Sequence, residues 1–183
     1  MQNSKIKKKI ITLIGPTACN KTSTAVHLIK KFPISIIGVD SVQIYKRFNI
    51  GSAKPPKEIL EKYKHHLVDS ADPENIFSVK DFYDQAYRIV MQAHSNNRIP
   101  LLVGGTMMYF NALFKGINDI PEGNEAIREE LQRELDNRGV DKLFNELKEI
   151  DPESAKTIKQ NDKQRIMRAL EVFKISGKKI SDF

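Results

Sequence analysis

The sequence predicts an α/β fold, with helices flanking a parallel sheet, followed by an all-helical unit. Three observations lead to this prediction. Short apolar, β-branched runs alternate with amphipathic helical stretches up to residue 117, which is the pattern of a parallel sheet. A phosphate-loop pattern separates the first such run from the first helical stretch. From residue 118 onwards the apolar periodicity is helical only.

The first half of the α/β part contains three predicted strands. Ile10–Ile14 and residues 34–39 are short apolar runs, which predict buried parallel strands. Lys21–Lys31 has an apolar helical face between them and is closed by Pro33. Residues 41–64 are predicted to be mostly loop, and residues 66–68 a short strand. The lysine-rich residues 1–9 that precede all of these are expected to be frayed.

A second helix–strand–helix group completes the predicted sheet. Ser78 and Asp81 have the spacing of a capping box, and an apolar helical face follows at residues 79, 82, 86, 89, 90 and 93. Residues 99–103 predict another buried strand, after which Gly104-Gly105 opens a helix. The resulting order is β-α-β-loop-β-α-β-α, with helices expected on both faces of the sheet.

The composition changes near residue 117, where we place a domain boundary. Ile127, Leu131 and Leu135 recur every four residues, and residues 143–150 and 166–173 carry two further apolar helical faces. Asp151-Pro152 is typical of an N-cap followed by the first helical residue. Residues 118–183 are therefore predicted to form an all-helical domain.

Composition limits the classes of function. The 183 residues are enough for one domain, or for a small domain with an insertion. A single cysteine, Cys19, excludes an internal disulfide and a cysteine-cluster zinc site. No apolar run approaches the roughly 20 residues of a membrane helix and no signal peptide is visible, so we expect a cytoplasmic protein without membrane association. Thirty basic and 23 acidic residues give a net charge of +7, which favours a polyanionic partner.

The segment from Gly15 to Thr22 matches the phosphate-loop template G-x-x-x-x-G-K-[ST] in every position but one, because Asn20 replaces the second glycine. Such a loop presents backbone N–H groups and a helix N-terminus to phosphate, with Lys21 for charge and Thr22 for Mg²⁺. Asparagine tolerates left-handed backbone angles, so Asn20 can keep the turn. Cys19 is interpreted as a small residue that fills the loop. The predicted phosphate-binding residues are Gly15, Pro16, Thr17, Ala18, Cys19, Asn20, Lys21 and Thr22.

Two polar residues follow predicted strands and should face the same crevice, because ligands of open parallel sheets bind beyond the carboxyl ends of the strands. Asp40 ends the strand 34–39 and is a candidate Mg²⁺ ligand, general base or helix cap. Thr106 follows Gly104-Gly105 and is a candidate ligand contact or helix N-cap. His65 and His66 are adjacent, so in a strand they point to opposite faces, and we interpret them as structural.

Together, several segments resemble one family, the tRNA dimethylallyltransferases (tRNA isopentenyltransferases). The similarity runs from about residue 10 to the end of the chain. The matching segments are Gly15 to Thr22, Val39 to Tyr45, Ile50 to Pro55, His65 to Asp69, Asp72-Pro73, Pro100 to Phe110 and Asn161 to Val172. Family members have glycine where this chain has Asn20, and they continue beyond the position of Phe183. We therefore expect this chain to be a fragment or a natural truncation.

The resemblance implies a function. The family transfers a dimethylallyl group from dimethylallyl diphosphate to N6 of adenosine 37, next to the anticodon of tRNA. It implies a P-loop NTPase-like sheet whose loop holds the diphosphate with Mg²⁺, and a helical insertion domain that binds the tRNA anticodon stem-loop. Asp40 would be the general base, and Thr106 would line the reaction channel. Further tRNA contacts implied by the resemblance are Ser41, Val42, Gln43, Arg128, Gln164, Arg165, Ile166, Met167 and Arg168. We expect a monomer.

Three other functions remain open at this point. A P-loop kinase would use ATP as the donor, with Asp40 activating an acceptor hydroxyl. A prenyltransferase acting on free AMP would share the same loop, although the basic helical half favours tRNA. A tRNA-binding protein with weak catalysis is the alternative from a different class, because of Asn20 and the position of the chain end.

Overall fold

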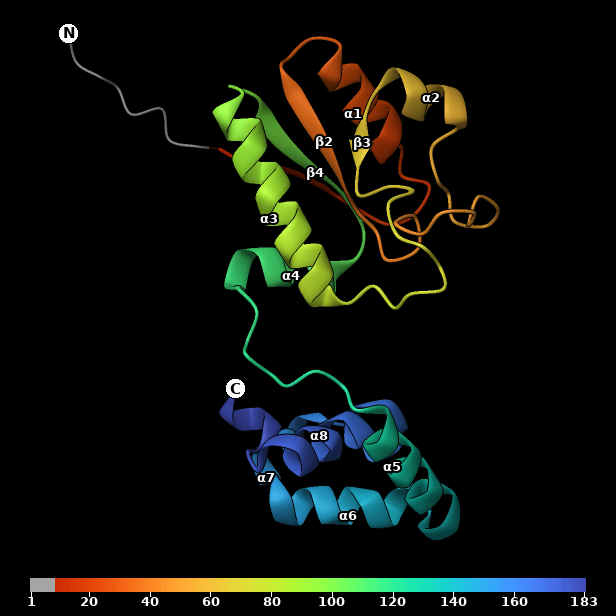
Figure 1. Cartoon of the computed structure of the whole chain (residues 1–183), viewed down its shortest axis with the longest axis vertical. Helices are drawn as coiled ribbons and strands as arrows, with labels where there is room; N and C mark the ends of the chain where they lie inside the picture. The colour runs from red at the N-terminus through yellow and green to blue at the C-terminus, as the bar shows by residue number, and fades with distance from the viewer. Residues whose placement is uncertain (1–8) are drawn as a thin grey trace, which may run out of the picture. The chain divides into compact units, whose positions relative to one another are not determined.

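The computed structural model describes residues 9–183. The chain divides into two compact units between Ile117 and Asn118, an α/β unit and a helical unit (Figure 1). Of the lysine-rich segment expected to be frayed, residues 1–8 lie outside the described part. Within the described residues, no helix is both long enough and apolar enough to cross a membrane.

Four parallel strands form the sheet of the α/β unit, which confirms the predicted fold class. They are β1 (Ile11–Ile14), β4 (Ile99–Gly104), β2 (Ile34–Val39) and β3 (His65–His66), in that spatial order. All six residues of β2 are buried, because this strand has a neighbour on each side and helices on both faces. The register places Val39 opposite Gly104, so β2 and β4 end together.

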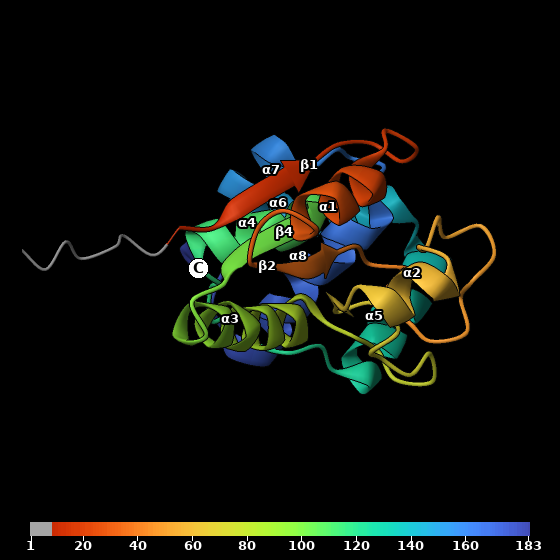
Figure 2. The ribbon, with the colours of Figure 1, turned by 90° about the horizontal axis from the view of Figure 1, so that it is seen from above.

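Helices cover both faces of this sheet, as the alternation of buried residues requires. Ile34, Ile36 and Leu101 pack under α1 (Lys21–Ile29). Ile37, Val39 and Leu102 pack on the opposite face, against α3 (Val79–Ser95) and α4 (Met107–Lys115). Figure 2 shows α1 and α3 on either side of the strands. The capping box predicted at Ser78 and Asp81 is present at the start of α3.

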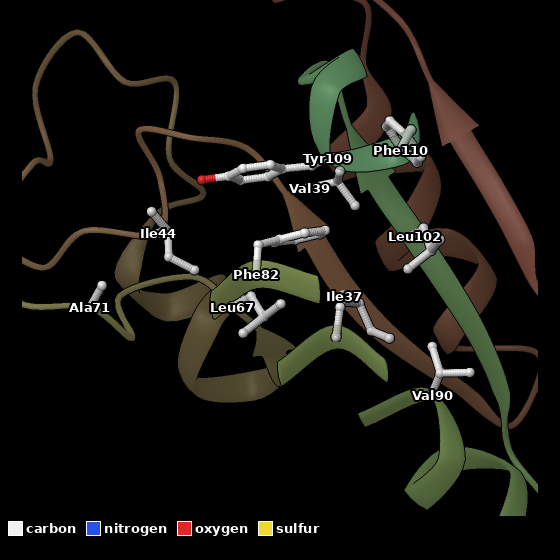
Figure 3. Packing of buried hydrophobic residues seen from close by; sticks show 11 residues of the cluster. Ile37, Val39, Ile44, Leu67, Ala71, Phe82, Val90, Leu102, Tyr109 and Phe110 are labelled. Atoms are coloured by element: carbon white, nitrogen blue, oxygen red, sulfur yellow. The ribbon is translucent and has the colours of Figure 1, made fainter. Parts of the chain in front are cut away.

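The larger core cluster of this unit fixes the start of α4. The Phe82 ring of α3 stacks on the Tyr109 ring of α4, with centroids 4.1 Å apart and planes 9° apart, as Figure 3 shows. Both side chains are almost completely buried, and Phe110 packs in the same cluster. These contacts fix the position of Thr106, the residue immediately before α4.

Two local predictions for this unit were wrong, and a third missed a short helix. The strand predicted as Ile10–Ile14 is not buried, because β1 is the end strand of the sheet and three of its four residues are exposed. Residues 41–64 are mostly loop, as predicted, but they include the short helix α2 (Lys57–Lys62), which the sequence did not reveal. The third strand, β3, comprises His65–His66 and therefore begins one residue before the predicted range.

The helical unit contains no strand, as the periodicity predicts. Its helices are α5 (Glu125–Arg138), α6 (Val140–Ile150), α7 (Pro152–Thr157) and α8 (Lys163–Ser176), followed by a 3₁₀ turn, η1 (Ile180–Asp182). Their apolar faces meet in one core. The buried members of this core are Leu131, Leu135, Leu143, Phe144, Leu147, Ile166, Ala169 and Leu170.

A buried carboxylate joins α7 to the C-terminal turn of this unit. Asp151 is 1% exposed and caps α7 by accepting a hydrogen bond from the backbone N–H of Ser154 at 3.0 Å. It also accepts bonds from the hydroxyls of Ser154 and Ser181, each at 2.7 Å, and from the Ser181 N–H at 3.0 Å. Burial by itself would raise the pKa of Asp151, but these hydrogen bonds outweigh it and lower the pKa.

Candidate functional site

A cavity of about 580 Å³ lies beyond the carboxyl ends of β2 and β4. The loop after β1 forms one wall, the exposed face of α1 a second, and residues 53–59 a third. The residues that the argument below uses are Asn20, Lys21, Thr22, Asp40, Gln43 and Gly104. The structure therefore brings the predicted phosphate loop and Asp40 to one cavity, which is where ligands of open parallel sheets bind.

The loop has a backbone suited to binding an anion. Asn20 adopts the left-handed conformation, with φ 60° and ψ 22°, as expected for the residue that replaces glycine here. Ala18 also has a positive φ, of 66°. No side chain caps the N-terminus of α1, and its first turn contains no acidic residue. The first N–H groups of α1 thus keep their partial positive charge available to a ligand.

Two side chains at the start of α1 add chemistry to this backbone. The Lys21 ammonium donates to the carbonyl of Gly15 at 2.9 Å and to that of Pro16, and it lies 3.6 Å from the Cys19 sulfur. Its charge is therefore held over the loop. Thr22 follows directly and lines the cavity with its hydroxyl-bearing side chain.

The donor set at this cavity fits Mg²⁺ bound together with a diphosphate. Within residues 9–183 no group of three or more His, Cys, Asp or Glu side chains could hold a metal by itself. Mg²⁺ usually takes one or two protein oxygens, with water and substrate phosphates as its other ligands. Thr22, at the phosphate loop, and Asp40, across the cavity, are oxygen donors of that kind.

Asp40 stabilises a turn with one carboxylate oxygen only. Its Oδ1 accepts hydrogen bonds from the N–H groups of Val42 at 2.9 Å and Gln43 at 3.0 Å. In the described part of the chain Oδ2 receives no hydrogen bond. The helix cap considered from the sequence is not present, because residues 41–44 form a turn and not a helix. Capping this turn leaves the second oxygen available to take a proton or to bind a cation.

Thr106 joins the ends of β2 and β4 instead of capping α4. Its hydroxyl accepts a hydrogen bond from the Ser41 N–H at 3.0 Å and makes no cap bond to its own helix. Its backbone N–H donates to the carbonyl of Val39 at 3.2 Å. Gly104 makes this closeness possible, because a Cβ there would lie 2.0 Å from the Val39 carbonyl oxygen.

Residues 41–43 form the turn after β2, beside Asp40. The Gln43 amide donates to the carbonyls of Ser52 at 3.1 Å and Ala53 at 3.0 Å, so Gln43 holds the following loop against the cavity. Lys54 holds the same loop from within. Its side chain is 3% exposed, and its ammonium bonds to Asp69 at 2.5 Å and to the Tyr45 carbonyl at 2.9 Å.

Tyr109 is a second titratable group near Asp40, and it stays neutral. Burial raises the pKa of Tyr109 to about 12, with smaller contributions from the charges of Tyr45, Asp40 and Asp81. A phenol with this pKa keeps its proton at neutral pH and does not act as a base. Tyr109 is therefore excluded as the base of this site.

Two candidate RNA-binding arginines of the helical unit share one buried partner. Glu171 is 2% exposed and accepts hydrogen bonds from Arg128 Nε at 2.8 Å, from the Asn124 N–H at 2.9 Å and from Arg168. Arg168 also donates to the Pro121 carbonyl at 2.6 Å. Burial would raise the pKa of Glu171, but the Arg168 and Asn124 hydrogen bonds and both arginine charges outweigh it and lower the pKa.

The other candidates at the start of α8 differ in accessibility. Gln164 and Arg165 are exposed, and Arg165 pairs with Asp162, which caps the helix, at 3.1 Å. Met167 is half-buried against the core. Ile166 is completely buried in that core, so its side chain cannot contact RNA. Ile166 lies on the inward face of the helix, so only its backbone is left for the predicted contact.

Comparison with known proteins gives the family. Residues 43–183 match the model of the IPP transferase family. The chain belongs to this family. It is 46% identical over 177 residues to a tRNA dimethylallyltransferase of Vesicomyosocius okutanii, covering 97% of this chain and 58% of the relative. It is 44% identical over 168 residues to that of Dichelobacter nodosus, covering 92% and 53%. The chain thus spans little more than half the length of these relatives.

Solved structures of IPP transferases have the same fold. A full-length tRNA isopentenylpyrophosphate transferase from Bacillus halodurans is 40% identical, with a TM-score of 0.58 over 93% of this chain and 57% of that one. A eukaryotic dimethylallyltransferase acting on tRNA is 29% identical, with a TM-score of 0.79 over 96% and 44%.

Sequence reasoning missed part of the candidate site. His27 and Lys30 line the cavity from α1, and they follow Ser23 at spacings of four and seven residues, which place all three on one helical face. That spacing was a signal available in the sequence. Glu171 was also missed as the shared partner of Arg128 and Arg168, although it lies three residues after Arg168.

Proposed function

We propose that this chain carries the donor-binding and proton-accepting parts of a tRNA dimethylallyltransferase. The reaction would transfer a dimethylallyl group from dimethylallyl diphosphate to N6 of adenosine 37, next to the anticodon. The observation that carries the proposal is that one cavity is lined by both the phosphate loop and Asp40. The relatives named tRNA dimethylallyltransferase support the choice of reaction.

The proposed role of the phosphate loop is to stabilise the leaving diphosphate. As the allylic C–O bond breaks, negative charge develops on the diphosphate oxygens. The α1 N-terminus and the Lys21 ammonium offset that charge. Mg²⁺, held through Thr22, would supply further positive charge when bound.

Asp40 is the proposed general base. The new C–N bond forms at N6 of the adenosine as the C–O bond breaks, and one N–H proton of N6 passes to the carboxylate. Oδ2 is suited to this transfer because Oδ1 is occupied by the turn at Val42 and Gln43. Ser41, Val42 and Gln43 would contact the adenosine and its neighbours, with Thr106 fixing the Ser41 backbone. The adenosine must leave its stack to reach such a site.

We propose that the helical unit binds the anticodon stem-loop. Arg165 is exposed and Arg128 is 53% exposed despite its ion pair, so both can reach phosphates. The Arg128–Glu171–Arg168 cluster keeps a net positive charge, since two arginines share one carboxylate. Gln164 and Met167 would add contacts to unstacked bases.

Incubation of the purified chain with labelled dimethylallyl diphosphate, Mg²⁺ and unmodified tRNA tests this function. The expected product after nuclease digestion is N6-dimethylallyl adenosine. A parallel reaction receives ATP labelled on the γ-phosphate. Transfer of label from ATP to a small acceptor, with none from the prenyl donor, would replace the proposal with a kinase. Binding of tRNA without either transfer would leave only an RNA-binding role.

A further inference from the structure

A second cavity, of about 410 Å³, lies at the opposite edge of the sheet from the candidate active site. Ile34 and Ser35 begin β2 and Arg98 immediately precedes β4, so this edge holds the amino ends of the strands. The cavity shares no lining residue with the first one. Its polar lining residues are Ser35, Lys62, Tyr63, Lys64, His66, Gln92, Asn96 and Arg98.

This lining is strongly basic. Lys62, Lys64 and Arg98 carry three positive charges, and no carboxylate lines the cavity. None of these three forms an ion pair within the described residues. Positive side chains are often found near the C-terminal ends of helices, where they offset the partial negative charge of the last carbonyls. Of these three residues, however, only Arg98 donates a hydrogen bond to a carbonyl, that of Ile34. The two lysines remain available to an anion.

The cavity is organised around fixed groups. The Arg98 guanidinium is anchored by the buried Ser35 hydroxyl at 2.9 Å. The ammonium groups of Lys30 and Lys62 lie 5.8 Å and 5.7 Å from the centre of the Tyr63 ring, which is within the range of cation–π attraction. The side-chain amides of Gln92 and Asn96 make no hydrogen bond in the described part of the chain, so they are free to bind a polar ligand.

We infer that this cavity binds a phosphate ester of a small polar molecule, about the size of a nucleoside monophosphate. The phosphate lies against Lys62, Lys64 and Arg98, and the rest of the molecule reaches Gln92 and Asn96. The volume falls within the roughly 300–1,000 Å³ of small-molecule sites. This inference does not depend on the proposed prenyl transfer, because it concerns a different edge of the sheet.

His66 supplies a local reporter of binding. Burial lowers the pKa of His66, and the charges of Lys64, Arg98 and His65 lower it further. A bound phosphate would offset these charges and raise the pKa of His66. His27 lines the first cavity, so the chemical shifts of its ring protons report phosphate there. The two sites can therefore be followed separately in one sample of the full chain.

The test is an NMR titration of the histidine ring protons against pH, with inorganic phosphate and with AMP as probes. Both probes should raise the pKa of His66 with saturation at roughly millimolar concentration, and AMP should bind more tightly. Lys62→Ala and Lys64→Ala should each weaken the His66 response roughly three- to tenfold and leave that of His27 unchanged. Lys21→Ala should weaken the response of His27 and leave that of His66 unchanged.

Lys57→Ala is the matched control. The substitution removes the same charge from the same helix as Lys62→Ala. Lys57 is exposed and pairs with Glu61, so the responses of His66 and His27 should both stay unchanged. A probe response at His27 without one at His66 overturns the inference. The inference is also overturned if tRNA changes the His66 signal while phosphate and AMP do not, because that result would assign the cavity to RNA.

Discussion

Replacing Glu171 with glutamine should destabilise the helical unit by about 2–3 kcal/mol. The substitution keeps the size of the side chain and one carbonyl-type oxygen, which can still accept from the Asn124 N–H. It loses the charge shared by two arginines and turns an NH₂ group towards one of them. A hydrogen bond to a charged group contributes roughly 1.5–3 kcal/mol. Arg128 and Arg168 are 53% and 33% exposed, so water recovers part of two such bonds.

The assay is urea unfolding followed by far-UV circular dichroism at pH 7, with amide hydrogen exchange in α5 and α8 assigning the loss to this unit. Glu129→Gln is the control, because Glu129 pairs with Arg133 at 3.2 Å where both side chains are exposed. It should cost less than about 0.5 kcal/mol. Equal losses in the two variants would refute the reasoning about Glu171.

The same substitution predicts a pH dependence. The pKa of Glu171 is lower in the folded chain than its ordinary value. Its contribution to stability is therefore fully present above the unfolded pKa of about 4.3 and is lost as pH falls through the folded pKa. The difference in unfolding free energy between wild type and Glu171→Gln should shrink below about pH 4. A difference that stays constant down to pH 2 would contradict the lowered pKa.

Three further predictions concern other residues. Asp40→Asn keeps the turn acceptor but removes the base, so the rate of tRNA prenylation should fall on the order of 10²–10⁴-fold; an unaltered rate would remove Asp40 from the mechanism. Asn20→Gly should bind inorganic diphosphate at least as well as wild type. Asn20→Val should lose about 1–2 kcal/mol of stability, because a β-branched residue is strained at φ 60°. Titration and scanning calorimetry measure the diphosphate affinity and the stability of both variants, and equal behaviour of the two would contradict the prediction. Ser181→Ala removes the 2.7 Å bond to the buried Asp151 and should cost about 1–2 kcal/mol, measured by thermal unfolding; an unchanged melting temperature would show that Asp151 does not anchor the C-terminal turn.

Much of the fold follows from local patterns in the sequence. The β-branched runs and the alternating helical stretches predict the parallel sheet, because such strands need helices on both faces. The strand–loop–helix order predicts the left-handed turn at Asn20, since the loop needs a residue that tolerates a positive φ. Asp40 and the phosphate loop share a cavity because both follow parallel strands.

The missed features depend on neighbours that a local pattern does not contain. The apolar residues of β1 indicate a strand but not that it lies at the end of the sheet. Helix α2 has only six residues and buries none of them, so it has no apolar face to detect. Arg128 and Glu171 are 43 positions apart, and their pairing depends on how α5 and α8 pack. Thr106 has the position of an N-cap, and only the tertiary fold shows that it bonds Ser41 instead.

The position of β1 at the end of the sheet has a consequence for the dynamics of the phosphate loop. Within residues 9–183, β1 is paired only with β4. Its opening therefore breaks fewer backbone hydrogen bonds than opening of β2, and its amide protons should exchange with solvent sooner. The loop from Gly15 to Asn20 connects this end strand to α1. An anion that binds only the ordered loop stabilises the closed strand by mass action. The exchange rate of the β1 amides that pair with β4 is therefore a direct readout of ligand occupancy at the loop.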